Sequence, residues 1–209
     1  LKLWRGILQW LGGVGIIVVA MVFLPELRVG GMQIFRSEAF DTMGKILPRA
    51  GEIASSISTI YIGLTIACAF AYAASGMGRF DSVVHAMTTV STGGMANTDA
   101  SFSRFGASTH YIAVVFMLLA ALPFVRFVQL LAGSAAPLWS DPQIRGLMTV
   151  ITVCVLLITS WVWGREAVMS EEAFREALFN VTSIMTGTGY ANAYKLSVST
   201  IGSNGLKRN

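Results

Sequence analysis

The sequence predicts an all-α integral membrane protein made of repeated helix–pore-helix–helix units, arranged as a pseudo-four-fold pore. Three observations carry this prediction. The 209 residues are 54% hydrophobic and only 12% charged, with a mean hydropathy of +0.64, whereas a soluble domain carries about 25% charged residues. Several apolar runs approach the ~20 residues that a membrane-spanning helix needs. Two short stretches rich in Thr and Gly recur at related places between these runs.

The apolar runs define four expected spans. They are Trp4–Leu24, Ile57–Ala74, His110–Ala132 and Leu147–Trp163. Pro25 should end the first span, and the glycines at 12, 13 and 15 should let another helix approach it closely. Pro123 predicts a kink in the third span. The Trp-Val-Trp run at 161–163 is typical of an interfacial aromatic belt.

Polar segments connect the spans. Residues 26–56 hold eight charged side chains and predict an aqueous connector, with Pro48 opening the next helix. Residues 133–146 begin with the turn-rich GSAAPLWSDP and predict a loop.

Residues 75–109 and 164–209 each include a semi-apolar segment that is too short to span a membrane. We expect Asp81 to cap the first short helix, and Ser170 with the Glu pair at 171–172 to start the second. Each short helix leads into a Thr-Gly stretch. This order is typical of a re-entrant half-helix followed by a loop.

The two Thr-Gly stretches read as copies of one unit. They are TTVSTGGMANTDASF at 88–102 and VTSIMTGTGYAN at 181–192. Superposing Gly93 on Gly187, an offset of 94 residues, aligns the short helices, and one residue inserted after Gly187 aligns MAN with YAN. Two loops cannot surround an axis, so the intact protein should hold more copies, most simply four. Internal repeats are common in membrane transport folds.

The chemistry of the loops favours a monovalent cation. The C-terminal end of a short helix carries a partial negative charge, and glycine permits positive φ, so the carbonyls after Thr92 and Thr186 can aim at one axis. Rings of such carbonyls replace the hydration shell of an alkali cation. No carboxylate lies in VSTGGM or IMTGTGY, and carboxylates are the ligands that divalent ions usually take.

Three other interpretations remain open. The loops could be ordinary external turns, or nests of N–H groups that bind an anion or phosphate, although no Lys follows in Walker spacing. The chain could also be a non-conducting fragment. No basic run favours nucleic acid, no catalytic constellation indicates an enzyme, and Cys68 and Cys154 are expected to be buried apolar residues.

Four polar residues call for interpretation, and three of them have two interpretations each. Arg126 lies ~24 Å along a straight third span, where snorkelling to the far interface is favoured over a gating role. For His85, polar packing is favoured over proton relay, and His110 at a span entrance is expected to be interfacial. Asp99 could cap a turn or draw cations to the mouth of the pore.

These motifs together resemble the TrkH/TrkG/KtrB superfamily of potassium transporters over almost all of residues 1–193. RGILQWLGGVGIIVVAMVFLP is similar to the last helix of the family's first repeat, and LRVGGMQIFRSEAFD and KILPRAGEIASSISTIYIGLT to its connector into the second repeat. TTVSTGGMANTDASF resembles the second filter and NVTSIMTGTGYAN the third.

The resemblance implies a gated, channel-like K+ uptake pore in the bacterial cytoplasmic membrane, with K+ as the transported ion and no organic cofactor. It implies a homodimer and a cytosolic nucleotide-binding regulatory subunit of the TrkA/KtrA type. Carbonyls of two filter walls would coordinate K+. The residues of these walls are Ser91, Thr92, Gly93, Gly94, Met185, Thr186, Gly187 and Thr188.

The resemblance also divides the chain. Residues 1–25 correspond to the last helix of the first repeat, 26–56 to the connector, 57–132 to the second repeat, 133–146 to a loop and 147–193 to an incomplete third repeat. Residues 194–209 form an atypical polar tail, where the family would continue into another helix. The chain also opens without an initiator Met or a signal-peptide pattern, so we expect it to be the central piece of a longer protein.

Overall fold

The computed structural model describes residues 1–23, 50–131, 133–134, 136–166 and 171–192, and all its elements there are helical. The predicted Pro25 stop, Pro48 helix start and Ser170 start signal, and most of the 26–56 connector, lie outside these residues. Helix α1 covers Lys2–Phe23 and α4 covers Ala50–Ala74. Helix α9 covers Pro142–Glu166. The predicted spans are therefore helical, and α4 and α9 begin several residues earlier than their apolar runs.

Within the part of the chain that the structure describes, two helical stretches are long and apolar enough to cross a membrane, Ala54–Ala74 and Pro142–Val162. The expected third span is broken. Helix α6, Ala107–Ala121, and helix α7, Phe124–Leu131, meet at 90° around Leu122 and Pro123. Proline has no N–H to donate to the helical hydrogen bond, and its ring clashes with the backbone of the preceding turn. The predicted kink is thus a right-angle turn between two separate helices.

The predicted loop at 133–146 contains structure of its own. A five-residue helix, α8, covers Ala136–Ser140, and α9 follows at Pro142. Proline is favoured at the first position of a helix, where its missing N–H would have no helical partner. This segment is therefore a short helical corner, which contacts both α7 and α9.

The two short helices are present at the predicted places. Helix α5, Arg79–Val90, and helix α10, Glu171–Met185, are about 18 and 22 Å long at ~1.5 Å per residue, which is too short to cross the hydrocarbon core. Asp81 does not cap α5: the N-cap position is Gly78, and Asp81 lies within the first turn. Its carboxylate instead binds the side chains of Asn97 and Arg104.

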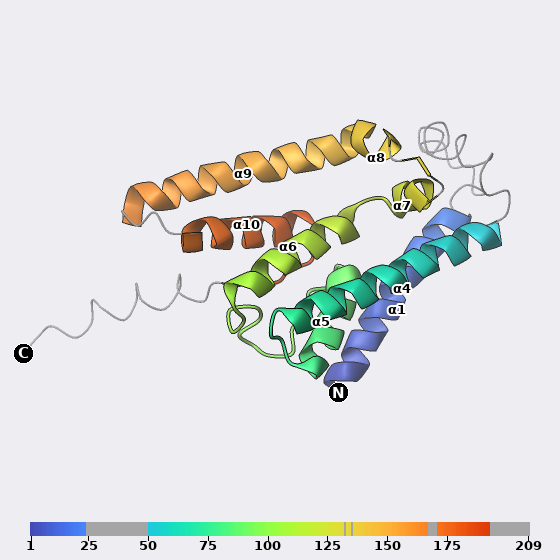
Figure 1. Ribbon diagram of the computed structural model, residues 1–209, viewed down its shortest axis with the longest axis horizontal. Coiled ribbons are helices and arrows are strands. Elements are labelled where there is room, and N and C mark those ends of the chain that lie inside the picture. The colour runs from blue at the N-terminus through green and yellow to red at the C-terminus, as the bar shows by residue number, and fades with distance from the viewer. Residues whose placement is uncertain (24–49, 132, 135, 167–170, 193–209) are drawn as a thin grey trace, which may run out of the picture.

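Helix packing places the short helices in equivalent settings. Helix α5 packs between α4, α1 and α6, and α10 packs against α9 and α6. Figure 1 shows α9 running beside α10, with α4 beside α1 at the other side of the structure. Each short helix therefore contacts the span before it in its own repeat and the last helix of the preceding repeat.

The apolar core lies where α1, α4, α5, α6 and α7 meet, with Tyr61, Tyr72 and Phe102 among its fully buried side chains. A smaller cluster joins α9 to α10 through Ile151, Val155, Ala177 and Val181. Large apolar side chains remain exposed on α4 and α9, including Phe70 at 73% and Leu157 at 65%. Such a surface suits contact with lipid or with further protein, since a bilayer solvates apolar side chains. Cys68 is buried and Cys154 half-buried, and both are free thiols.

Candidate functional site

The loop after α5 turns its N–H groups back toward the helix. The last helical residue is Val90. Four successive N–H groups then donate to carbonyls of the last turns, as Ser91 to Met87, Thr92 to Thr89, and Gly93 and Gly94 both to Thr88, over 2.9–3.3 Å. These bonds satisfy carbonyls that would otherwise have no partner at a helix C-terminus.

The loop after α10 is built in the same way. The N–H groups of Thr186, Gly187 and Gly189 donate to the carbonyls of Thr182, Ile184 and Ser183 respectively, over 2.9–3.1 Å. The Thr186 hydroxyl also bonds to the Thr182 carbonyl at 2.8 Å and to the Thr188 hydroxyl at 2.8 Å. Both Thr-Gly stretches are thus C-terminal caps of short helices.

The two loops superpose with an offset of 95 residues, one more than their Thr-Gly sequences suggest. Thr92 and Gly187 occupy equivalent places, because each has positive φ (51° and 73°) and donates to the carbonyl three residues before it. Gly94 and Gly189 are likewise equivalent, with φ of 64° and 85° and N–H bonds to the carbonyl six residues before. The predicted alignment of Gly93 with Gly187, and its inserted residue, are therefore wrong.

A second pair of contacts supports this register. In the second repeat, the backbone N–H of Asn97 points to Nε2 of His85 at 3.5 Å. In the third repeat, the N–H of Asn192 points to Oδ1 of Asn180 at 3.4 Å. Both pairs obey the 95-residue offset. In each repeat a side chain of the short helix therefore holds the chain that leaves the loop.

The register changes how the predicted filter residues are distributed. Ser91, Thr92, Gly93 and Gly94 are all half-buried in the second loop. Met185 is the last residue of α10 and is 40% exposed. Its structural counterpart is the buried Val90 rather than a loop residue. The counterpart of Gly94 is Gly189, which the sequence alignment left outside the predicted set.

The two loops contact each other directly. A Cβ added to Gly94 would overlap the carbonyl oxygen of Thr188. Thr186 is half-buried, Thr188 is buried and Gly187 is exposed, with no neighbour within 4 Å of an added Cβ. The loops that follow α5 and α10 thus lie side by side at Gly94 and Thr188.

Tyr190 joins the third loop to the second repeat. Its hydroxyl group lies within hydrogen-bonding distance of the Thr88 hydroxyl and donates to the His85 carbonyl at 3.3 Å. Its ring packs on Phe102, with 4.4 Å between ring centroids. The Ser183 hydroxyl donates to the Tyr190 carbonyl at 2.8 Å. Sequence reasoning aligned Tyr190 with Met95 but gave it no role, because its partners lie about 100 residues away.

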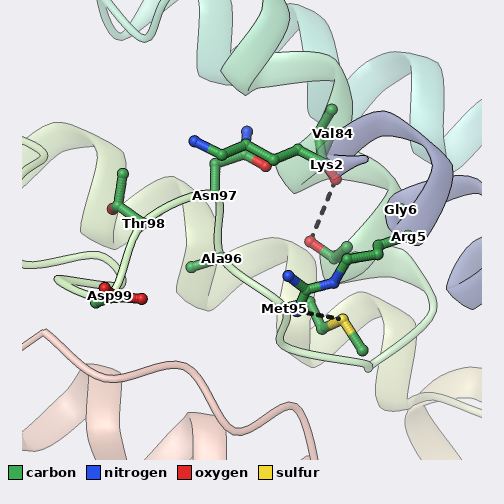
Figure 2. Close-up of a pocket in the computed structure, with 10 residues that line it drawn as sticks. Lys2, Arg5, Gly6, Val84, Met95, Ala96, Asn97, Thr98 and Asp99 are labelled. Atoms are coloured by element: carbon green, nitrogen blue, oxygen red, sulfur yellow. Dashed lines mark hydrogen bonds between the residues drawn. The ribbon is translucent and has the colours of Figure 1, made fainter.

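A cavity of about 200 Å³ opens beside the second loop, between its exit segment and the start of α1. Lys2, Arg5, Asn97, Thr98 and Asp99 are among its lining residues, and Figure 2 shows the Lys2 side chain reaching across to Asn97. Nη2 of Arg5 lies 3.4 Å from Sδ of Met95. Asp99 therefore lines the same cavity as two cationic side chains, whose charges offset that of its carboxylate.

The two histidines and Arg126 have definite partners. His85 is 1% exposed, and its Nδ1 lies 2.8 Å from the Asp81 carbonyl, as expected for polar packing. His110 is buried, with Nε2 at 2.8 Å from the Phe102 carbonyl. Arg126 does not snorkel along a straight span. It follows the helix break, and its Nε donates to Asp141 at 2.8 Å.

Comparison with known proteins identifies the family. The family TrkH, described as a cation transport protein, matches residues 1–201. The chain is 44% identical to the Trk system potassium uptake protein TrkI of Halomonas elongata over 92% of this chain and 39% of that protein. It is 35% identical to TrkH of Escherichia coli K12 over 90% and 40% of the two chains.

A solved structure agrees. The crystal structure of the potassium transporter TrkH from Vibrio parahaemolyticus superposes with a TM-score of 0.78 at 33% identity, covering 92% of this chain and 39% of that one. The chain thus spans about two fifths of the length of these relatives. The apolar helices, the repeated short helices with their Thr-Gly caps and these matches together show that the chain belongs to the TrkH family of cation transport proteins.

Proposed function

We propose that the chain forms the central part of a K+ uptake pore and contributes two walls of its selectivity filter. The observation that carries the proposal is the direction of the loop N–H groups. The N–H groups of residues 91–94, and those of Thr186, Gly187 and Gly189, are bonded back to helix carbonyls, so these groups do not converge on an anion. Loop carbonyls then remain as the polar groups suited to a cation.

The electrostatics of the two short helices support the same choice. Both helices end three or four residues before the contact between Gly94 and Thr188, which joins the loops that follow them. Each end carries about half a negative charge from aligned peptide dipoles. Neither helix has a basic residue in its last turn to neutralise that charge. A monovalent cation bound between the loops would therefore be stabilised by both helices.

The competing anion-nest function requires free N–H groups at Gly93 and Gly187. Both groups donate to helix carbonyls, at 2.9 and 3.1 Å. An anion would have to break these caps before binding. We therefore favour K+ coordination by the carbonyls of the eight residues predicted from sequence, together with Gly189 as the counterpart of Gly94.

The proposal extends to the whole protein. Relatives of this chain are more than twice its length, and a filter needs loops from further repeats. We propose a gated pore of four repeats, in a homodimer that binds a cytosolic nucleotide-binding subunit of the TrkA/KtrA type. Mass measurement of the purified full-length protein, with and without that subunit, tests the assembly.

Complementation tests the transport function. The full-length gene should restore growth at low K+ to a bacterium that lacks K+ uptake. Gly189→Ala should abolish this rescue or let Na+ compete, because φ at 189 is 85° and an L side chain is strained there. Gly106→Ala is the matched control, since φ at 106 is −73° and nothing lies within 4 Å of an added Cβ. Failure of the wild-type gene at normal membrane levels would reject the proposal.

A further inference from the structure

Gln9 reaches the second loop from a different repeat. It lies on α1, and its Nε2 donates to the Gly93 carbonyl at 2.7 Å. The amide orientation is fixed by this partner, because the reverse placement would bring two acceptor oxygens together. Its Oε1 is buried and has no hydrogen-bond partner among the residues that the structure describes. The amide therefore acts on the loop as a donor.

The space that Gln9 occupies explains why residue 93 is glycine. A Cβ on Gly93 would overlap Cδ and Nε2 of Gln9 and lie 2.5 Å from its Cγ. The backbone does not require glycine there, since φ at 93 lies outside the left-handed region, unlike φ at Gly94. Gly93 is thus needed for close approach of the amide rather than for its conformation.

Helix α1 holds Gln9 in place. One turn further along, Gly13 lets α1 approach α5 so closely that an added Cβ would lie 2.9 Å from Cβ of Ser91. Nε1 of Trp10 donates to the Thr65 hydroxyl at 2.9 Å, and the Tyr61 hydroxyl donates to the Trp10 carbonyl at 3.0 Å. The amide of Gln9 is therefore delivered by a helix that is fixed on both α4 and α5.

We propose that Gln9 is a positioning residue for the selectivity filter: it orients the Gly93 carbonyl through its amide N–H and so sets the ion preference of the second wall. This inference rests on the proposed K+ function. A hydrogen bond to a carbonyl fixes its direction and draws electron density from its oxygen. The last helix of one repeat thereby determines the coordination geometry in the next.

The first experiment measures selectivity in the full-length protein. Gln9→Met keeps the length of the side chain but removes the donor, so the K+ over Na+ preference in uptake should change by a factor of about 3 to 10, the equivalent of one hydrogen bond. Gln143→Met is the control, because Gln143 is exposed at the start of α9, and it should leave the preference unchanged. Equal preferences in the two variants would overturn the proposal.

The second experiment tests the contact without ion transport. Thermal unfolding of the purified protein is compared for Gln9→Ala, Gly93→Ala and the double variant. Alanine at 9 clears the space beside residue 93, so Gly93→Ala should lower Tm less in that background than in the wild type. Strictly additive effects would reject the contact. If the contact holds but the wild-type protein fails to transport K+, the proposed function fails, and the selectivity role falls with it.

Discussion

Three glycines of the two loops serve three different physical needs. Gly93 provides space for Gln9. Gly187 provides a positive φ of 73° in an otherwise open position. Gly94 provides both, with φ of 64° and the Thr188 carbonyl against its α-carbon. The sequence alone cannot distinguish these needs, because the residue at each of the three positions is glycine.

This difference predicts a graded response to alanine. Gly187→Ala should destabilise the full-length protein by about 1 kcal/mol, the strain of an L residue at positive φ. Gly94→Ala should cost more, about 3 kcal/mol or above, because strain is joined by a clash with backbone that cannot move freely. Denaturant unfolding in detergent measures both. Equal losses in the two variants would show that the contact between the loops is absent.

At the scale of elements, hydropathy predicted which segments are helical and which helices are short. It could not predict that α6 and α7 meet at 90°, because Pro123 specifies a break but not the packing that sets its angle. It also missed the register of the repeat. Matching the Thr-Gly pairs aligned Gly93 with Gly187. In the backbone conformation, the residue equivalent to Gly187 is instead Thr92, a non-glycine residue with φ of 51°.

The corner after the helix break is held by one buried ion pair. Arg126 and Asp141 meet at 2.8 Å, with side chains 17% and 6% exposed, and Nη1 of Arg126 also donates to Gln129 at 3.0 Å. Burial raises the pKa of the Asp141 carboxyl. Hydrogen bonds from the Arg126 side chain and the Gln143 N–H together lower this pKa by more than burial raises it. The net pKa of Asp141 lies below its ordinary value.

A lowered pKa fixes the sign of the pH dependence. The ion pair stabilises the fold above the unfolded-state pKa of about 3.9 and is lost as pH falls through the lower folded-state pKa. Asp141→Asn should therefore cost about 2 kcal/mol at pH 7 and progressively less below about pH 4. Glu171→Gln, at a 57% exposed ion pair with Arg175, should cost under about 1 kcal/mol. A pH-independent difference between wild type and Asp141→Asn would contradict this assignment.

At the scale of the whole molecule, the chain is a multi-pass protein of the bacterial cytoplasmic membrane, like the transporters it matches. Helices of one repeat pack against the short helix of the next repeat. Helix α1 packs on α5 as α6 packs on α10, so each short helix is supported by the repeat before it. Support also runs in the opposite direction, since Tyr190 of the third repeat binds α5 of the second repeat.

The Tyr190 contact predicts that one hydroxyl group couples the third loop to the second repeat. Tyr190→Phe keeps the ring on Phe102 but removes the bonds to Thr88 and His85. We expect a loss of about 1–2 kcal/mol in unfolding and a lower K+ over Na+ preference, because the third loop can then move relative to the second. Tyr111→Phe removes a hydroxyl that donates to the exposed Glu171 at 2.8 Å, and it should preserve the preference. If Tyr190→Phe loses stability but retains full selectivity, the hydroxyl supports the fold alone, and the spacing of the walls is set elsewhere.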